Sequence, residues 1–386
     1  MFVVETVLNT SCNLCCYFCF AKNKDGKIVD VKQIKEILDN IDNLTNEDEI
    51  QFKYYGGEAM LSQDLLLEHF KLINSYKDKT NKNMYIVLIT NGTIFPNKEL
   101  LNMIKNGLVR ISISMEGDKE EHDNIRKFLN NQGSFDIVMN NINKLYQATK
   151  KPILIQTVMS KQWMENIDNF LNFVSNNREK LSFCLMPMFG YNEITDEMLN
   201  IFSYSLEKYR NHIINDYEKY GKTNLSIFQE MRGIMKLYAT YNYDNSQYSC
   251  LAGYEQITLV GNEYYPCSRT YHNKFYFSKY KDLNDYKNKR KFYKEQIMHS
   301  QKCISCQKKN SIGCIGSCFV TNWLNGNEHA EEVCKYNIIF GQHINILFKT
   351  LKNNQQFKKD FNKMIKDNIN LNENMFDKII KLLEMI

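Results

Sequence analysis

The segment at positions 12–19 reads CNLCCYFC and places four thiols within eight residues, directly after the apolar run FVVETVL at positions 2–8. Thiolates so close together can hold zinc or an iron–sulfur cluster. Because Cys15 and Cys16 are adjacent, two ligand spacings are possible. One is CxxxCxxC, with Cys12, Cys16 and Cys19, and the other is CxxCxxxC, with Cys15 in place of Cys16. Three ligands on a four-iron cluster leave one iron open, and an open metal position is typical of catalysis.

The rest of the composition fits a globular protein of the cytoplasm. The chain has 386 residues, of which 43% are hydrophobic, enough for one large or two ordinary domains. Its formal net charge of +5 is spread without a long basic run, so nothing points to nucleic acid or to a membrane surface. We expect neither a signal peptide nor a membrane span, because the first apolar run lacks a basic flank and no run is long enough. In a reducing compartment, clustered cysteines indicate metal binding before disulfides.

Short β-rich runs alternate with amphipathic helical stretches over the first half of the chain. A helix is expected at 31–41, with Asp30 before it, and another at 135–145, with Ser134 as its N-cap. Strands separated by helices form parallel sheets. The fold class predicted is α/β, a partial (β/α)6 TIM-like barrel. Its six strands are expected at 2–8, 49–55, 84–90, 109–115, 153–159 and 181–187.

Barrels of this kind place their chemistry at the C-terminal ends of the strands. The cysteine segment follows the first expected strand, and unusual segments follow the next three. These are Gly56-Gly57-Glu58, the TNG at 90–92 and the SMEG at 114–117. Each is weak evidence by itself, since a lone GGE or TNG is usually a turn. Their order along successive strand ends predicts one shared site.

With these motifs in place, the sequence resembles the radical S-adenosylmethionine (radical SAM) enzymes, whose signature is CxxxCxxC after the first strand of a partial barrel. The resemblance assigns Cys12, Cys16 and Cys19 as ligands of a 4Fe-4S cluster and leaves Cys15 as an extra thiol. An aromatic residue precedes the last cysteine in that family, and Phe18 fills the position here. The resemblance implies that an electron from the cluster cleaves SAM to methionine and a 5′-deoxyadenosyl radical, which takes a hydrogen atom from the substrate.

The same resemblance suggests which residues bind SAM. Gly56, Gly57 and Glu58 look like the family's GGE motif, in which the backbone approaches the ammonium group of SAM. The remaining candidates lie where similar enzymes contact the ribose or the carboxylate; they are Asn91, Ser112, Ser114 and Arg126. Ser112 and Ser114 also fit simple packing along a strand.

A second cysteine group is similar to the SPASM extension of radical SAM peptide maturases. Its members are Cys250, Cys267, Cys303, Cys306, Cys314, Cys318 and Cys334. The resemblance implies one auxiliary 4Fe-4S cluster on Cys250, Cys267 and Cys318. It implies a second on Cys303, Cys306, Cys314 and Cys334, which makes three clusters in all. A pair of zinc sites is the alternative, although zinc has no redox chemistry.

The first auxiliary cluster is one ligand short in this assignment. Cys184 could complete it, a non-Cys ligand could do so, or the open iron could bind a substrate thiolate; Cys184 also fits a buried strand thiol. Cys15, Cys184 and Arg269 are the candidates for catalytic groups. The expected domains are the radical SAM partial barrel at 1–190, a helical connection at 191–248, the SPASM domain at 249–340 and a helical tail at 341–386.

The function expected is oxidative modification of a ribosomally made precursor peptide, with a Cys thioether cross-link as the leading product. Same-fold alternatives are formylglycine formation, as in anaerobic sulfatase maturases, and peptide epimerisation. The sulfatase maturases carry Asp directly after the cysteine matching Cys267, whereas this chain has Ser268 and Arg269. An alternative of another class is a non-enzymatic iron–sulfur protein. The partners implied are the peptide and a flavodoxin- or ferredoxin-type electron donor. Because the expected barrel starts at residue 2, recognition of the peptide is expected from a separate leader-recognition protein, from the segment at 190–248 or from the helical tail.

Overall fold

The computed structural model describes residues 1–19, 21, 24–77, 79–187, 195–231, 252–272, 279–296, 331–369 and 375–385. They form two compact units. The first holds residues 1–155 and 251–297, and the second holds residues 156–250 and 298–386. In the described residues, no helix is long and apolar enough to cross a membrane.

Parallel strands form the sheet of the first unit. Strand β1 (Phe2–Val7) pairs in parallel with β2 (Glu49–Tyr55), β2 with β3 (Asn83–Thr90), and β3 with β4 (Val109–Ser114). These are four of the strands that the sequence predicts, with ends shifted by at most one residue. β5 (Ile153–Met159) and β6 (Leu181–Pro187) follow in the chain and coincide with the last two predicted strands.

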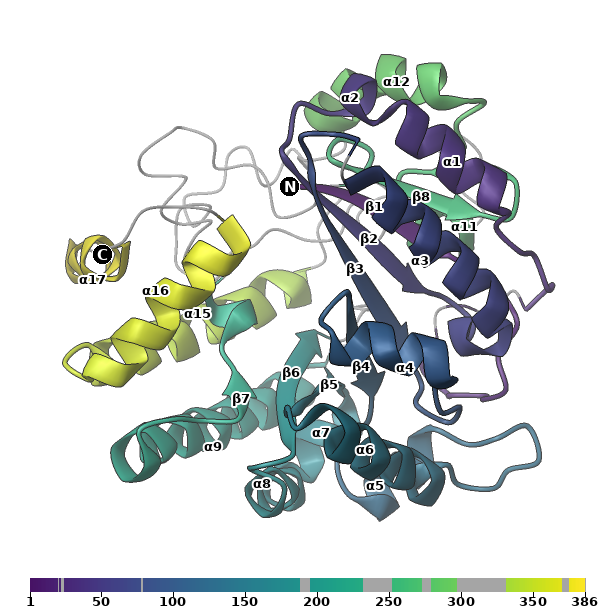
Figure 1. The fold of residues 1–386 in the computed structure, drawn as a ribbon. Coiled ribbons are helices and arrows are strands. Elements are labelled where there is room, and N and C mark those ends of the chain that lie inside the picture. The colour runs from purple at the N-terminus through teal and green to yellow at the C-terminus, as the bar shows by residue number, and fades with distance from the viewer. Residues whose placement is uncertain are drawn as a thin grey trace. The chain divides into compact units, whose positions relative to one another are not determined.

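Helices cover one face of this sheet. α1 (Val31–Asp39) and α3 (Gln63–Lys77) lie side by side across it, as Figure 1 shows. Between and around them come α2 (Ile41–Leu44), the 3-10 helix η1 (Ala59–Ser62) and α4 (Lys98–Lys105). α1 begins as predicted, with Asp30 accepting from the Lys32 amide and closing a capping box with Gln33.

The alternation of buried residues along the strands decides which face the helices cover. Phe52 and Tyr54 of β2 point to the helices and are fully buried in a core with Phe70 of α3. Burying each side chain of this size contributes roughly 1.5–3 kcal/mol. Their neighbours Lys53 and Tyr55 point to the opposite face.

The rest of the first unit consists of α5 (Lys119–Ile125), α6 (Phe135–Thr149) and a later segment that returns to the sheet. Ser134 is the N-cap residue of α6, as predicted, but its side chain makes no capping hydrogen bond to the helix. The Ser134 hydroxyl donates instead to the Arg126 carbonyl at 2.7 Å, and the Phe135 amide donates to Asp123 Oδ1 at 2.8 Å. The Ser134 hydroxyl therefore bonds to the Arg126 carbonyl in place of a capping hydrogen bond within α6.

The returning segment was not among the predicted strands. β8 (Gln256–Val260) pairs in parallel with β1, and β9 (Glu263–Tyr265) pairs antiparallel with β8. The helices α11 (Ser268–His272) and α12 (Leu283–Gln296) follow. The segment extends the sheet at the side of its first strand.

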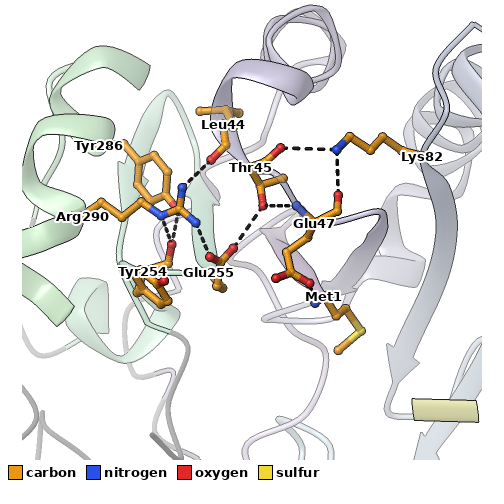
Figure 2. A network of polar contacts seen from close by, with 9 residues as sticks. All are labelled: Met1, Leu44, Thr45, Glu47, Lys82, Tyr254, Glu255, Tyr286 and Arg290. Atoms are coloured by element: carbon orange, nitrogen blue, oxygen red, sulfur yellow. Dashed lines mark hydrogen bonds and ion pairs between the residues drawn. The ribbon is translucent and has the colours of Figure 1, made fainter. Parts of the chain in front are cut away.

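A polar network ties this segment to the N-terminal edge of the sheet (Figure 2). Arg290 of α12 donates to the carbonyls of Tyr254 at 2.6 Å and Leu44 at 3.0 Å, and it pairs with the Glu255 carboxylate. Thr45 then donates to Glu255 at 3.2 Å. Lys82 and the pair between Met1 and Glu47 extend the network to the starts of β3 and β1. These contacts lie at the strand ends opposite the predicted site, where stability is the expected role.

The second unit is mainly helical. Its elements after β5 are α7 (Lys161–Glu165), α8 (Ile167–Asn176), β6, α9 (Asp196–Tyr220), β7 (Leu225–Ser226), α15 (Glu331–Leu351), α16 (Gln355–Ile369) and α17 (Met375–Met385). Phe202 of α9 stacks on Tyr336 of α15 with ring centroids 4.3 Å apart. Phe348, Phe357 and Phe376 form an aromatic cluster among the last three helices. The described residues at the C-terminal end of the chain are thus helical, and the four-part domain division stays a prediction.

Candidate active site

The cysteine segment lies between two loops that hold its backbone. On one side the Glu58 amide donates to the Ser11 carbonyl at 2.7 Å. On the other side the Cys15 amide donates to the Lys127 carbonyl at 2.8 Å, and Leu14 forms an isolated bridge with Phe128. Loops that follow β2 and α5 thus fix the segment that follows β1.

Two of the thiols receive N–H donors from neighbouring loops. Asn91 Nδ2 lies 3.8 Å from Cys12 Sγ, and Arg126 Nη1 lies 3.8 Å from Cys16 Sγ. Burial raises the pKa of Cys12 to about 11 and also raises the pKa of Cys16. Cys19 is half-buried, and its thiol donates to the Ala21 carbonyl at 3.7 Å. In their metal-free state Cys12 and Cys16 are therefore neutral thiols, and a metal that binds them displaces protons.

Cys15 differs from the other three cysteines of the segment. It is exposed, and its thiol donates to the carbonyls of Lys127 at 3.5 Å and Phe128 at 3.3 Å. These contacts make Cys15 an anchor of the segment and support the spacing that uses Cys16. Whether Cys15 has a catalytic role stays open.

The donor chemistry of the segment fits an iron–sulfur cluster. Cys12, Cys16 and Cys19 are free of disulfide bonds, and thiolates are the soft ligands that such clusters require. N–H groups that point at two of the sulfurs are the outer partners that a cluster ligand needs. Over the part of the chain that the structure describes, no three His, Cys, Asp or Glu side chains already converge as in a preformed metal site.

The two glycines of the GGE segment allow a close backbone approach. Gly56 has φ +86° and Gly57 has φ +50°, in the left-handed region that favours glycine. A Cβ on Gly57 would lie 2.2 Å from the Ser11 carbonyl oxygen and 2.6 Å from that of Asn9. The backbone of residues 9–11, which leads into the cysteine segment, therefore occupies the space beside Gly57.

Glu58 joins the loops that follow β2 and β3. It is 1% exposed, and its carboxylate accepts from the Met60 amide at 2.9 Å, the Thr90 hydroxyl at 2.6 Å and the Asn91 amide at 2.6 Å. Burial raises the pKa of Glu58, and the three hydrogen bonds oppose that effect. The carboxylate thereby positions Asn91, whose side chain reaches Cys12.

Arg126 is buried at the C-terminal end of α5. Its Nε and Nη2 donate to Glu116 Oε1 at 2.9 and 2.6 Å, and its guanidinium lies 5.5 Å from the centre of the Phe18 ring. Burial lowers the pKa of Arg126, but Glu116 and Cys16 more than reverse this effect, so its pKa is raised and the group is charged. The site thus gathers Cys12, Cys16, Phe18, Gly57, Glu58, Asn91 and Arg126.

The two serines of β4 lie on the strand face that the helices do not cover, because they alternate with the buried Ile113. Ser112 is 1% exposed and donates to the Leu154 carbonyl at 3.4 Å, while Ser114 is half-buried at the strand end. Their assignment to SAM stays a prediction.

A carboxylate on the same uncovered face escaped the sequence analysis. Glu5 of β1 is 6% exposed and accepts from Lys53 at 3.0 Å, Tyr55 at 3.0 Å and Thr258 at 3.1 Å. The Tyr55 hydroxyl also contacts the hydroxyl of Ser268, the residue that follows Cys267 in the sequence. An acidic residue inside the apolar run FVVETVL was the available signal. Glu116 was missed as well, because only the tertiary structure shows that it faces Arg126.

Most of the second cysteine group lies outside the described residues, namely Cys250, Cys303, Cys306, Cys314 and Cys318. Cys267 is half-buried before α11, and Cys334 is half-buried in α15. Cys184 is buried in β6, and Arg269 lies in α11. The auxiliary clusters and the catalytic candidates Cys15, Cys184 and Arg269 therefore stay predictions.

Comparison with known families identifies the class of protein. Residues 6–174 match the profile of the Radical SAM superfamily. This span begins in β1 and contains the cysteine segment, the GGE loop, Asn91 and Arg126. Residues 6–174 therefore form a radical SAM domain, and the protein is an enzyme. The predicted family and the prediction that the protein is an enzyme are confirmed.

Individual relatives agree with this class. The chain is 26% identical over 321 residues to the cysteine-type anaerobic sulfatase-maturating enzyme of Clostridium novyi, covering 77% of this chain and 83% of that protein. The structure resembles native anSMEcpe with bound AdoMet and Cp18Cys peptide, with TM-score 0.66, 18% identity and coverage of 90% and 98%. It also resembles SuiB of Streptococcus suis bound to its precursor peptide SuiA, with TM-score 0.58, 16% identity and coverage of 86% and 74%. These likenesses confirm the partial-barrel fold.

Proposed function

We propose that this radical SAM enzyme oxidises a cysteine- or serine-containing peptide. The observation that carries the proposal is the gathering of the cysteine segment, the GGE loop, Asn91 and Arg126 at the C-terminal ends of β1 to β4. Cys12, Cys16 and Cys19 would hold a 4Fe-4S cluster, and the GGE loop with Asn91, Ser112, Ser114 and Arg126 would contact SAM. When bound, these two cofactors supply a 5′-deoxyadenosyl radical that removes hydrogen from the substrate.

The residues around the cofactors would position them. Glu58 holds the loops after β2 and β3 together through three hydrogen bonds. Lys127 and Phe128 hold the middle of the cysteine segment through Cys15. The face of the sheet that carries Glu5 would face the substrate. The protein itself would orient the reacting carbon and exclude water.

Two products of such an oxidation deserve direct comparison, namely a Cys thioether cross-link and formylglycine. The second cysteine group, with its resemblance to a SPASM extension, supports auxiliary clusters that accept electrons in either reaction. Similarity to a sulfatase-maturating enzyme over 77% of the chain supports formylglycine. The absence of Asp after Cys267 is evidence against formylglycine formation. The Tyr55 hydroxyl, however, contacts both the Glu5 carboxylate and the Ser268 hydroxyl. That link supplies a carboxylate near the same position, so the absence of Asp no longer separates the two reactions.

The substrate would therefore be a peptide, and the electron donor a flavodoxin- or ferredoxin-type protein. A peptide could add as a strand to an exposed sheet edge, or a separate leader-recognition protein could deliver it. Two solved structures of similar fold contain bound peptides, Cp18Cys in one and SuiA in the other. They support peptide as the substrate class of this chain.

Iron content after anaerobic reconstitution tests the cofactors first. Three four-iron clusters correspond to about twelve irons per chain, falling to about eight in the Cys12→Ala, Cys16→Ala, Cys19→Ala variant. About four irons per chain in the wild type and none in this variant would support the radical-initiating cluster but refute the auxiliary clusters. Iron content that does not change in the variant would refute the proposed ligands.

Mass spectrometry of synthetic peptides distinguishes the products. Matched peptides would carry Cys, Ser or Ala at one position and would be incubated with SAM and dithionite. A thioether removes two hydrogens and retains sulfur, whereas formylglycine from Cys loses sulfur and gives an aldehyde that reacts with a hydrazide. Epimerisation leaves the mass unchanged in water and adds deuterium in D2O. SAM cleavage without any of these changes, across both precursor peptides and sulfatase-motif peptides, would contradict peptide oxidation.

A further inference from the structure

The ion pair between Arg126 and Glu116 has a defined direction relative to the cysteine segment. Both contacts to Glu116 use the Nε and Nη2 edge of the guanidinium, at 2.9 and 2.6 Å. The other nitrogen, Nη1, points to Cys16 Sγ at 3.8 Å. The positive end of the pair therefore faces the thiol, and the negative end lies on the far side of the guanidinium.

A chain of hydrogen bonds holds the two ends of this pair at a fixed separation. The Glu116 amide donates to His122 Nδ1 at 3.5 Å, and His122 Nε2 lies 2.9 Å from Ser134 Oγ. The Ser134 hydroxyl donates to the Arg126 carbonyl at 2.7 Å. Because the Ser134 hydroxyl donates its one hydrogen to the Arg126 carbonyl, its oxygen must accept from His122 Nε2–H. In this neutral tautomer Nδ1 carries no hydrogen and accepts from the Glu116 amide. The chain runs from the backbone of Glu116 to the backbone of Arg126 through the neutral imidazole.

The pair is also shielded from solvent. The side chains of Arg126 and Glu116 are 10% and 2% exposed. Charges interact more strongly in such surroundings than on a solvated surface. Keeping a buried ion pair costs desolvation energy, and replacing such a pair by apolar residues is often neutral or stabilising. Stability alone therefore does not explain this ion pair, whose positive charge is directed at Cys16.

We propose that Arg126, held by Glu116, raises the reduction potential of the cluster on Cys12, Cys16 and Cys19, an inference that rests on the cluster proposed above. Reduction adds one negative charge to the cluster. A cation and an N–H donor at a ligand sulfur stabilise the reduced form relative to the oxidised form, because cluster potentials depend on net charge and on hydrogen bonds to sulfur. Asn91 gives Cys12 a neutral donor at the same distance, and a neutral donor should act more weakly.

Two substitutions on this pair should shift the potential in opposite directions. Arg126→Met removes the cation and the donor, so the ratio of reduced to oxidised cluster at a fixed potential should fall about tenfold, equivalent to about 59 mV for a one-electron couple. Glu116→Gln keeps an acceptor for Arg126 but removes the opposing negative charge, so the potential should rise. Arg126→Lys retains the charge without the planar fork and should lie between the wild type and Arg126→Met.

The matched control is Arg110→Met, which also replaces an arginine by methionine in the first unit of the chain. Arg110 is exposed on β4, with its guanidinium 5.4 Å from the centre of the Tyr85 ring. Its removal should leave the cluster potential unchanged, because the charge is solvated and screened.

The experiment is an anaerobic redox titration of the reconstituted full chain, followed by electron paramagnetic resonance without SAM or peptide. The relevant signal is the one missing from the Cys12→Ala, Cys16→Ala, Cys19→Ala variant, and iron content confirms loading. Opposite shifts for Arg126→Met and Glu116→Gln would support the inference, since a purely structural disturbance would not reverse sign. Unchanged potentials, or shifts of the same sign, in loaded variants would overturn it. A signal that persists in the triple cysteine variant would instead refute the proposed cluster.

Discussion

Replacing Gly57 by Ala should disturb both the stability of the protein and the cysteine segment. The left-handed backbone at φ +50° costs an Ala roughly 1–2 kcal/mol. The new Cβ would also meet the Ser11 carbonyl oxygen at 2.2 Å and the Thr10 carbonyl carbon at 2.7 Å. Backbone atoms cannot rotate away, so this overlap adds about 1–3 kcal/mol. The total cost is about 2–5 kcal/mol.

Gly107→Ala is the matched control for the backbone cost. Gly107 has φ +75°, but a Cβ there would meet nothing within 4 Å. Its cost should be only the backbone contribution, about 1–2 kcal/mol. The difference between the two variants isolates the contact with the backbone of residues 9–11, and at about 2–4 °C per kcal/mol it corresponds to about 2–12 °C in melting temperature.

Thermal unfolding of the metal-free chain, followed by circular dichroism under reducing conditions, measures this difference. Iron uptake after anaerobic reconstitution should also fall in Gly57→Ala and remain normal in Gly107→Ala, because only Gly57 supports the backbone before Cys12. Equal melting temperatures for the two variants would show that the backbone of the cysteine segment moves away freely. The close approach would then not be what requires glycine at this position.

Three further substitutions and one control variant test other parts of the structure. Arg290→Met should lower the free energy of unfolding in urea by about 2–4 kcal/mol, since it removes charged hydrogen bonds to two carbonyls and a carboxylate. The control is Lys352→Met, which breaks an exposed ion pair with Glu384 and should lower the same free energy by less than about 1 kcal/mol. His122 has a pKa lowered to about 3 by burial and by Arg126, from its usual 6.5. The folded state therefore keeps it neutral at pH 5 while the unfolded state binds a proton, so stability from this residue is lost as pH falls below 6.5. The stability advantage of wild type over His122→Gln should shrink by about 2 kcal/mol between pH 7.5 and pH 5 in urea unfolding, and an advantage independent of pH would contradict the neutral imidazole. Tyr336→Ala should cost about 3–5 kcal/mol by the same measurement, because the ring stacks on Phe202, and a loss below 1 kcal/mol would refute that packing.

Local patterns were sufficient for the elements that carry the cofactor site. The strands at 49–55, 153–159 and 181–187 were predicted with the bounds observed. Along the first two, alternating burial leaves a period of two in the sequence. The cysteine segment and the GGE loop follow the first two strands, so their proximity follows from parallel pairing alone. The family was likewise readable, since its motifs are short and continuous.

Contacts between distant segments were not readable in the same way. β8 pairs with β1 across some 250 positions of sequence, as in the register of Glu5 with Thr258, and a five-residue strand carries no sign of its partner. The same holds for side chains that serve a partner elsewhere. Ser134 is the N-cap residue of α6, as the sequence predicts, but its hydroxyl donates to the Arg126 carbonyl and not to a group of the helix.

The sequence by itself determined the class of enzyme, the order of the first six strands, and the cysteines that predict a cluster. Periodicity and short motifs express local hydrogen bonding and burial, and these act between residues close in the chain. Only the tertiary structure decided that Gly57 lies against the cysteine segment, that Glu5 connects to Ser268 and that Arg126 presents its charge to Cys16. Each of these depends on the direction of side chains brought together by the sheet, and residue types and their spacing do not encode that direction.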